Sequence, residues 1–154
     1  MREAMKKKIM NRKGVTLIEL VVVLVIIAIG AALTAPGIGA WLPYYRLRSA
    51  TRDLVSTMRV AQMKAISKNL RYQISFDIPN RSYIVQYLNT AGTPVNDGAR
   101  QTLPTGVQFN TDFGNVANFF ANSSSTDGNV SLNNTKGKTK SIRLWGTTGR
   151  IKSE

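Results

Sequence analysis

The residue that first suggests chemistry is Glu19, a lone carboxylate inside an apolar stretch. Residues 15–35 are 21 consecutive positions in which Glu19 is the only charged side chain. As a helix rising 1.5 Å per residue they would extend roughly 31 Å, about the thickness of the hydrocarbon core of a bilayer. A charge inside such a segment costs on the order of 2.5–3.5 kcal/mol at its centre, so an ionisable residue there is by default a candidate for function.

The rest of the sequence offers little for catalysis. The chain has no histidine and no cysteine, so the usual general base, the commonest metal ligand and the disulfides of many secreted domains are all missing. The acidic residues downstream of the apolar stretch are isolated from one another, without ligand spacing. The sequence therefore predicts a protein that is not an enzyme and that has no catalytic, cofactor-binding or metal site.

A basic segment precedes the apolar stretch. Residues 1–14 carry six basic side chains against Glu3, which gives a net charge of +5. Because basic residues beside an apolar span stay in the cytoplasm, this asymmetry orients the chain with its C-terminal part outside. A cleaved secretory signal would have a shorter apolar region followed by an A-x-A-like site, and no such site leads into Pro36. A simple signal anchor is one interpretation of these features.

The sequence KGVTLIE at residues 13–19 resembles the N-terminal signature of type IV pilins and of type II secretion pseudopilins. In that family a prepilin peptidase cuts after the glycine and methylates the new amino terminus. The resemblance implies cleavage between Gly14 and Val15, N-methylation of Val15, and a place for Glu19 as the fifth residue of the mature chain. Val15 stands where the family usually has phenylalanine.

The same resemblance implies that Glu19 acts in filament assembly. A carboxylate among packed apolar helices is tolerable only when it is paired. The implied partner is the amine of Val15 in a neighbouring subunit, and this pair would fix the axial register of the filament. The alternative is that Glu19 lies at the level of the lipid headgroups. The resemblance also implies a helix kink at Pro36, since proline interrupts helical hydrogen bonding.

Beyond the apolar stretch the sequence predicts an α+β fold. Apolar residues spaced three and four apart predict a helix from about residue 43 to 69, with an apolar face. Alternating residues then predict a hairpin of two strands that ends near Leu88, and shorter apolar runs follow. The expected fold is a long N-terminal helix, transmembrane and then amphipathic, packed on a small antiparallel β-sheet head. Residues 121–140 are low in apolar content and are expected to be mobile.

These features predict three parts of the chain. Residues 1–14 are a basic leader peptide removed by prepilin peptidase, and residues 15–43 are a transmembrane and filament-core helix. Residues 44–154 are a helix plus a β-rich extracytoplasmic head. Two looser motifs in the head, A-x-x-x-A-I at residues 61–66 and G-R at residues 149–150, resemble the GspH/FimT group of minor pilins and pseudopilins. Minor subunits of this group lie at or near the filament tip or help to prime assembly.

Positive charge is concentrated in two segments. Residues 46–71 carry seven basic side chains against one acid, and residues 136–152 carry six and no acid. Such a pattern is the electrostatic footprint of nucleic-acid binding. FimT-type minor pilins bind DNA through a G-R-x-R motif, and the sequence GRIK at residues 149–152 matches it except for Lys152. The candidate DNA contacts are Lys136, Lys138, Lys140, Arg143, Arg150 and Lys152. The same charge could instead face acidic pilin neighbours or anionic lipid headgroups.

The sequence as a whole predicts a minor structural subunit of a type IV pilus. It would be held in the bacterial inner membrane by a single span, with its C-terminal head in the periplasm, and would then enter a filament. Its expected partners are other pilin or pseudopilin subunits, prepilin peptidase and the inner membrane, with DNA as a further candidate. Two alternatives stay open: a FimT-like DNA-binding minor pilin for DNA uptake, and a GspH-like pseudopilin of type II secretion.

Overall fold

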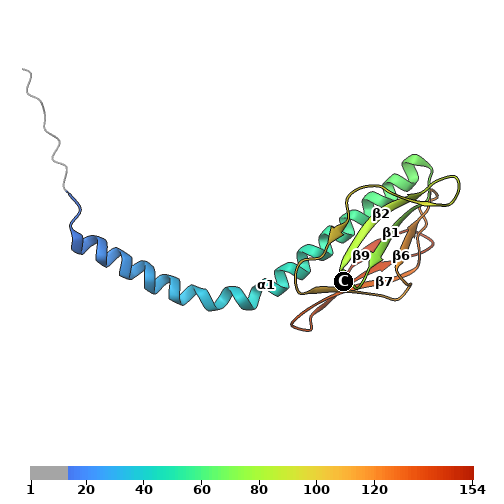
Figure 1. The fold of residues 1–154 in the computed structure, drawn as a ribbon. Coiled ribbons are helices and arrows are strands. Elements are labelled where there is room, and N and C mark those ends of the chain that lie inside the picture. The colour runs from blue at the N-terminus through green and yellow to red at the C-terminus, as the bar shows by residue number, and fades with distance from the viewer. Residues whose placement is uncertain (1–13) are drawn as a thin grey trace, which may run out of the picture. The chain divides into compact units, whose positions relative to one another are not determined.

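The computed structural model describes residues 14–154, except for the side chains of residues 34–38 and of residue 40. The predicted leader lies outside the described residues apart from Gly14. The chain divides into two compact units, Met1–Gly39 and Ala40–Glu154. One helix, α1 (Leu17–Lys68), contributes to both units, and every strand belongs to the second (Figure 1). Pro36 lies among the residues whose side chains are not described, so the kink there stays a prediction.

The first sheet is antiparallel and contains the predicted hairpin. Its strands follow the order β3-β2-β1-β6, and β4 also pairs with β2. The hairpin register places Tyr72 opposite Tyr87 and Asp77 opposite Ser82. The strands are β1 (Tyr72–Asp77), β2 (Ser82–Leu88), β3 (Pro94–Asn96), β4 (Gln101–Thr102) and β6 (Val116–Phe119).

The second sheet is also antiparallel, and the sequence did not separate it from the first. Its strands follow the order β5-β7-β8-β9. The head therefore has two sheets where one was expected, because β6 returns to pair with β1 whereas β5, which precedes β6 in the chain, pairs with β7. The strands are β5 (Val107–Thr111), β7 (Gly128–Asn134), β8 (Thr139–Leu144) and β9 (Ile151–Ser153).

The expectation that residues 121–140 are mobile is wrong. They contain β7, which lies between β5 and β8 in the second sheet. Its alternate residues are buried, and Val130 and Leu132 are fully so. The residues between them are asparagine and serine, which face the other side of the sheet and lower the average hydropathy of the segment. A strand of period two needs only every second residue to be apolar, and average composition hides that period.

The second half of α1 and both sheets share one hydrophobic core. The apolar face predicted from the spacing is confirmed, because Leu54, Met58 and Ala61 are fully buried in a cluster with residues of both sheets. Aromatic rings join the sheets to each other: Phe76 of β1 meets Phe109 of β5 edge to face, with 5.4 Å between ring centroids. This α+β architecture is the predicted fold class.

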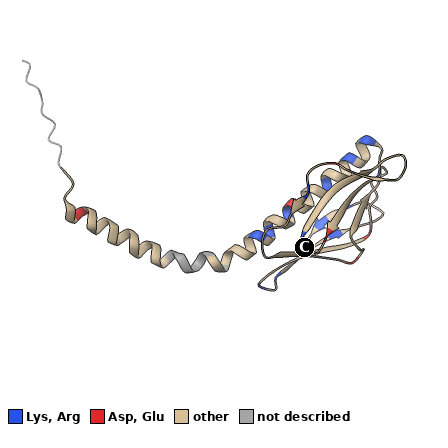
Figure 2. Ribbon diagram, viewed as in Figure 1, with Lys and Arg blue, Asp and Glu red and all other residues tan. Residues whose placement is uncertain are grey.

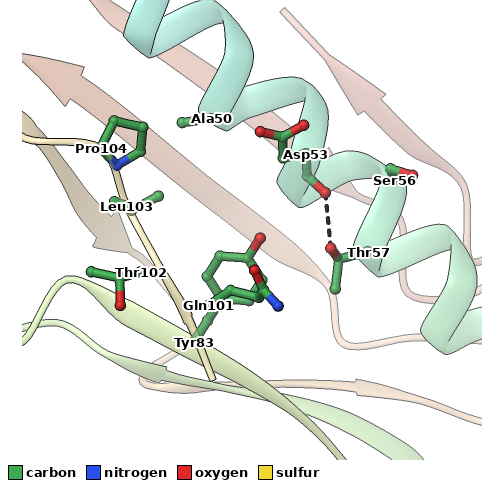
Figure 3. A pocket seen from close by; sticks show the side chains of 9 residues that line it. All are labelled: Ala50, Asp53, Ser56, Thr57, Tyr83, Gln101, Thr102, Leu103 and Pro104. Carbon is green, nitrogen blue, oxygen red and sulfur yellow. Dashed lines mark hydrogen bonds between the residues drawn. The ribbon is translucent and has the colours of Figure 1, made fainter. Parts of the chain in front are cut away.

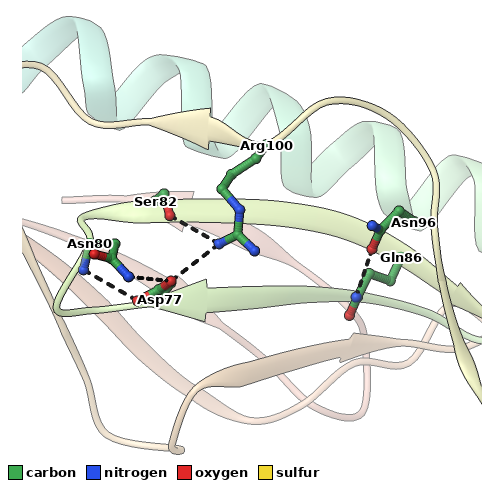
Figure 4. Close-up of polar contacts among 6 residues, drawn as sticks. All are labelled: Asp77, Asn80, Ser82, Gln86, Asn96 and Arg100. Carbon is green, nitrogen blue, oxygen red and sulfur yellow. Dashed lines mark hydrogen bonds and ion pairs between the residues drawn. The ribbon is translucent and has the colours of Figure 1, made fainter.

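Two ion pairs fasten the loop between β3 and β4. Lys64 of α1 lies 3.0 Å from Asp97 at one end of the loop. At the other end the Arg100 guanidinium donates to Asp77 at 3.3 Å and to the Ser82 hydroxyl at 3.1 Å (Figure 4). Asp77 and Ser82 are the last and first residues of the hairpin strands, so the loop is held to both α1 and the turn of the hairpin.

Both carboxylates in these ion pairs have shifted pKa values. Hydrogen bonds from Asn80 lower the pKa of Asp77, and Arg100 lowers it further. The Lys64 ammonium beside Asp97 lowers the pKa of that carboxyl. A pKa lowered by folding means that the folded state favours the charged carboxylate.

We expect the head to lose stability in acid through these two groups. A lowered pKa contributes stability that is present above the ordinary value of 3.8 and is lost as the pH falls through the folded-state value. Asp97→Asn should lower stability at pH 7 and flatten the loss below about pH 4. Urea unfolding of residues 40–154 between pH 7 and pH 2.5 measures both effects, with Glu154→Gln as a control for the removal of one negative charge. An unchanged acid dependence in Asp97→Asn would contradict this assignment.

Candidate filament-assembly and anion-binding sites

The predicted processing site lies immediately before α1. Gly14 and Val15 are exposed and not helical, and Val15 is 73% exposed. The first helical hydrogen bond runs from the Leu20 N–H to the Thr16 carbonyl at 3.2 Å. A peptide bond in exposed, non-helical chain is open to a peptidase. This placement suits cleavage after Gly14, which stays a prediction.

Glu19 lies in the first turn of α1, where Thr16 caps the helix. The Glu19 N–H donates to Thr16 Oγ1 at 3.3 Å. This is one of the two hydrogen bonds of a capping box, in which a threonine N-cap is followed three residues later by glutamate. An acidic residue in the first turn also interacts favourably with the helix dipole. Glu19 therefore has a local role beside its predicted role in register, and the T-x-x-E pattern at residues 16–19 was the sequence signal for it.

The first part of α1 exposes its apolar side chains on all sides. The exposed fraction runs from 43% at Val21 to 83% at Leu17. Figure 2 shows this part of the helix without basic residues, with one acidic residue at its start. No helix within the described part of the chain is both long and apolar enough to cross a membrane. Large exposed apolar surfaces in general mark sites of interaction.

The six basic residues predicted to contact DNA do not form one surface. Arg143 and Lys152 lie directly opposite each other on β8 and β9, on the face of the second sheet that points away from the core. Like charges in this arrangement repel. Each has an acidic neighbour, with Arg143 at 3.1 Å from Asp127 and Lys152 at 3.5 Å from Glu154. Surface pairs of this kind are weak, about 0–1 kcal/mol, and compete poorly with a polyanion.

Lys138 and Lys140 lie at a different place, beside α1. Lys140 pairs with the fully buried Leu132 across β7 and β8, so it extends from the core-facing side of the sheet at its end. The two lysines meet Arg48 of α1 around a hollow of about 250 Å³. We call this the basal hollow; its lining residues are Tyr44, Leu47, Arg48, Lys138, Thr139 and Lys140. Lys136 is exposed in the adjoining turn.

Arg150 occupies a third place, in the loop between β8 and β9. Its guanidinium lies over the Trp145 ring, 5.3 Å from the ring centroid. The preceding residue, Gly149, is buried with a φ of +60°. A Cβ at Gly149 would overlap the Ser123 carbonyl oxygen and the Gln62 side chain. The glycine of the G-R motif is therefore required by close packing.

Gln62 of α1 fastens this loop to the helix. Its side-chain amide donates to the Gly149 carbonyl at 2.8 Å and to the Ser123 carbonyl at 3.2 Å. We call this set of contacts the Gln62 latch. It fixes the position of Arg150 through the residue before it. No sequence pattern indicates the latch, because Gln62, Ser123 and Gly149 are far apart along the chain.

Several basic residues of the predicted basic helix are bound within the head. Arg46 donates to the Thr105 carbonyl at 3.1 Å, and Lys64 pairs with Asp97. Arg71, just after the helix, donates to Asn118 through two nitrogens at 2.8 and 3.1 Å. These contacts hold loops and strands against the helix end, so part of the basic charge of residues 46–71 is structural.

A polar hollow of about 410 Å³ lies between α1 and the segment around β4 (Figure 3). Asp53 and Thr57 line it from the helix, and Tyr83 and Gln101 line it from the sheet. Burial raises the pKa of the Tyr83 hydroxyl, and the Asp53 charge raises it further. These groups can donate and accept hydrogen bonds. The lining residues include no histidine, lysine or arginine, and the arrangement matches no nucleophile and base pair.

Comparison with known proteins gives a motif for the N-terminal segment and a fold for the head. Residues 9–35 match the prokaryotic N-terminal methylation motif. No curated protein matches the chain in sequence. The minor pseudopilin EpsH from the type 2 secretion system of Vibrio cholerae has the same fold, with a TM-score of 0.63 at 11% identity over 71% of this chain and 96% of EpsH. The type IV minor pilin FimU of Pseudomonas aeruginosa matches with a TM-score of 0.58 at 17% identity, over 70% of this chain and 92% of FimU.

The chain is type IV pilin-like. It carries the N-terminal methylation motif, and its head has the fold of the minor pseudopilin EpsH and the minor pilin FimU. The resemblance read from the sequence is confirmed at this level. At identities of 11% and 17% the two structures show the fold alone.

In this pilin-like head we expect Gly149→Ala to be strongly destabilising. The substitution forces a side chain into a left-handed conformation, at about 1–2 kcal/mol, and adds the overlap with Ser123, for a total of about 2 kcal/mol or more. Gly137→Ala is the matched control, because Gly137 has a φ of +73° with open space around it and should lose only the conformational part. Urea unfolding of residues 40–154 measures both losses, and equal losses would contradict the packing requirement.

Proposed function

We propose that this pilin-like chain is a minor structural subunit of a type IV pilus. Prepilin peptidase removes residues 1–14, and residues 15–43 hold the mature chain in the inner membrane with residues 44–154 in the periplasm. The helix later packs among those of other subunits. The observation that carries the proposal is the methylation motif over residues 9–35, followed into α1 by apolar side chains that are exposed from Leu17 to Leu33. A bilayer, and later neighbouring helices, would remove that surface from water.

A GspH-like role in type II secretion is the alternative machine for the same subunit. It is favoured by the fold shared with the pseudopilin EpsH over 96% of that chain. Assembly would proceed through the same processing and the same helix, so the assembly test below applies in cells that carry either machine. Incorporation in one background and not in the other assigns the machine.

Within this proposal the charge of Glu19 pairs with the amine of Val15 in a neighbouring subunit and sets the axial register. A subunit out of register would leave a charge unpaired in an apolar filament core, at a cost of about 3–5 kcal/mol. The Glu19 N–H also donates the capping hydrogen bond to Thr16 Oγ1. A substitution at Glu19 or Thr16 could therefore affect assembly by weakening the start of the helix as well as by removing the charge. The two roles separate because one depends on the carboxylate charge and the other on the threonine hydroxyl.

Glu19→Gln and Thr16→Val should therefore behave differently. Glutamine removes the charge and retains a side chain that can complete a capping box, whereas Thr16→Val removes the cap and retains the charge. We expect Glu19→Gln to lower filament incorporation about tenfold or more, because it leaves the amine unpaired, and Thr16→Val to incorporate nearly normally. Immunoblots of sheared filaments against the membrane fraction measure incorporation.

Mass spectrometry of the mature amino terminus is the control, since both variants should still be cleaved after Gly14. Normal incorporation of cleaved Glu19→Gln would remove the register argument. A loss in Thr16→Val as large as that in Glu19→Gln would assign the effect to helix capping.

DNA uptake is the second candidate function, favoured by the arrangement at β8 and β9. Arg143 and Lys152 place two cations side by side, and Arg150 places a planar guanidinium over Trp145. Cations that neutralise phosphates supply most of the affinity for DNA, and an aromatic ring can stack on bases. The Arg143–Lys152 pair and the loop that carries Arg150 would each contribute to weak DNA binding without sequence preference.

A mobility shift with residues 40–154 and duplex DNA across a salt series tests this function. Reversing charge at two residues, Arg150→Glu with Lys152→Glu, should abolish binding or reduce the slope of log K against log salt by about 1.8. The matched control is Lys138→Glu with Lys140→Glu, which changes the net charge equally at the basal hollow. Equal losses in the two variants would indicate a non-localised charge effect, and no binding by the unchanged head at low salt would contradict DNA uptake.

A further inference from the structure

We propose that the basal hollow binds the headgroup of an anionic phospholipid in the membrane that anchors the chain. Three basic residues line it, Arg48, Lys138 and Lys140, and its lining includes no acidic residue. The lining also includes Leu47, which is 3% exposed, and Tyr44. Basic residues beside apolar ones suit an amphiphile whose phosphate meets the cations and whose carbon chain meets the apolar side chains.

One lysine of the hollow, Lys138, is held on a defined turn. The side-chain oxygen of Asn134 accepts from the N–H groups of Lys136 and Lys138, each at 3.0 Å. The Asn134 N–H also donates to the Lys138 carbonyl at 2.9 Å, and Asn134 is only 4% exposed. The backbone that carries Lys138 is therefore positioned before any ligand arrives, which lowers the entropic loss on binding.

Two exposed aromatic residues of α1 line a second hollow, which shares Arg48 with the basal hollow. Trp41 is 62% exposed and Tyr45 is 54% exposed, and their rings lie 5.1 Å apart between centroids. Tyr44, between them in sequence, is part of the hollow itself. Tryptophan and tyrosine are enriched where proteins meet lipid headgroups, because one end of each side chain is apolar and the other polar. Aromatic residues beside cations are what a membrane-facing surface requires.

The length of the chain limits how far Tyr44 of the hollow can lie from the apolar segment. Tyr44 follows Ala35 by nine residues, and nine residues span at most about 32 Å when fully extended. A bilayer surface that contains anionic lipid attracts nearby lysine and arginine. The inference rests on the proposed function, since it assumes that residues 15–35 lie in the bilayer.

An acidic segment of another subunit could also meet these cations, but the apolar lining residues and the aromatic residues favour a lipid.

The test uses the mature full chain, labelled with ¹⁵N, in nanodiscs of phosphatidylcholine containing from none to about a third phosphatidylglycerol. We expect the amide signals of Lys138, Thr139 and Lys140 to shift saturably with phosphatidylglycerol. Lys138→Gln with Lys140→Gln should raise the half-saturating fraction at least about fivefold, because each cation near an anionic surface contributes to binding. The matched control, Lys136→Gln with Lys152→Gln, removes the same charge outside the lining and should stay within about twofold of the unchanged chain.

Three outcomes would overturn the inference. The first is an equal effect of the two double variants, which would make the response a property of net charge. The second is the same shifts on adding inorganic phosphate to phosphatidylcholine discs, which would assign the hollow to free phosphate. The third is insertion into the discs without a response to phosphatidylglycerol, which overturns the lipid site and leaves the membrane anchor intact. A chain that does not insert at all counts against the proposed anchor as well.

Discussion

The burial of one face of α1 is the interaction on which the rest of the head depends. Leu54, Met58 and Ala61 lie in a single cluster with residues from both sheets, and burying a leucine or methionine side chain contributes about 1.5–3 kcal/mol. The alanines on this face let the strands approach the helix closely, as close packing requires. Neither sheet has another helix to cover its apolar side, since α1 is the only helix among the residues described.

The polar sides of the same helix organise the loops. Arg46, Gln62 and Lys64 reach three different connections, at Thr105, Gly149 and Asp97. Each contact ties a segment without regular pairing of its own to the most regular element of the head. One helix thus supplies both the apolar support of the sheets and the anchoring points of their connections. Because several basic side chains of the helix bind these loops, only part of its positive charge is available to bind partners.

Most of the fold could be predicted from periodicity. The apolar spacing on α1 and the alternation in β1 and β2 were sufficient because each pattern extends over several residues. β7 was missed because Val130 and Leu132 alternate with asparagine and serine, and average composition concealed the strand. β3 and β4, of three and two residues, are too short to carry a pattern. Their position depends on the ion pairs of Asp97 and Arg100.

The sequence predicts which residue types form the candidate sites, but it does not predict which of these residues lie together in the fold. Six cations near the C-terminal end of the chain read as one patch, whereas strand register sends Arg143 and Lys152 to one face and Lys140 to the other. The basal hollow needed Arg48, which is distant in sequence and reaches the lysines only through tertiary packing. The capping role of Thr16 and Glu19 was local and could have been predicted.

The Gln62 latch can form only late in folding, because the chain is synthesised from its amino terminus and Gly149 lies near its carboxyl end. Gln62 and Gly149 are 87 positions apart, and contacts of such long separation form late because a large loop must close first. If the head is exported as proposed, the second half of α1 would reach the far side of the membrane well before β8 and β9, with its sheet-binding face still uncovered. Without cysteines, no disulfide could hold a partly folded head in that interval. The time between the arrival of the helix and that of the last strands is when the chain would be most exposed to aggregation and proteolysis, and when a chaperone would have most to protect.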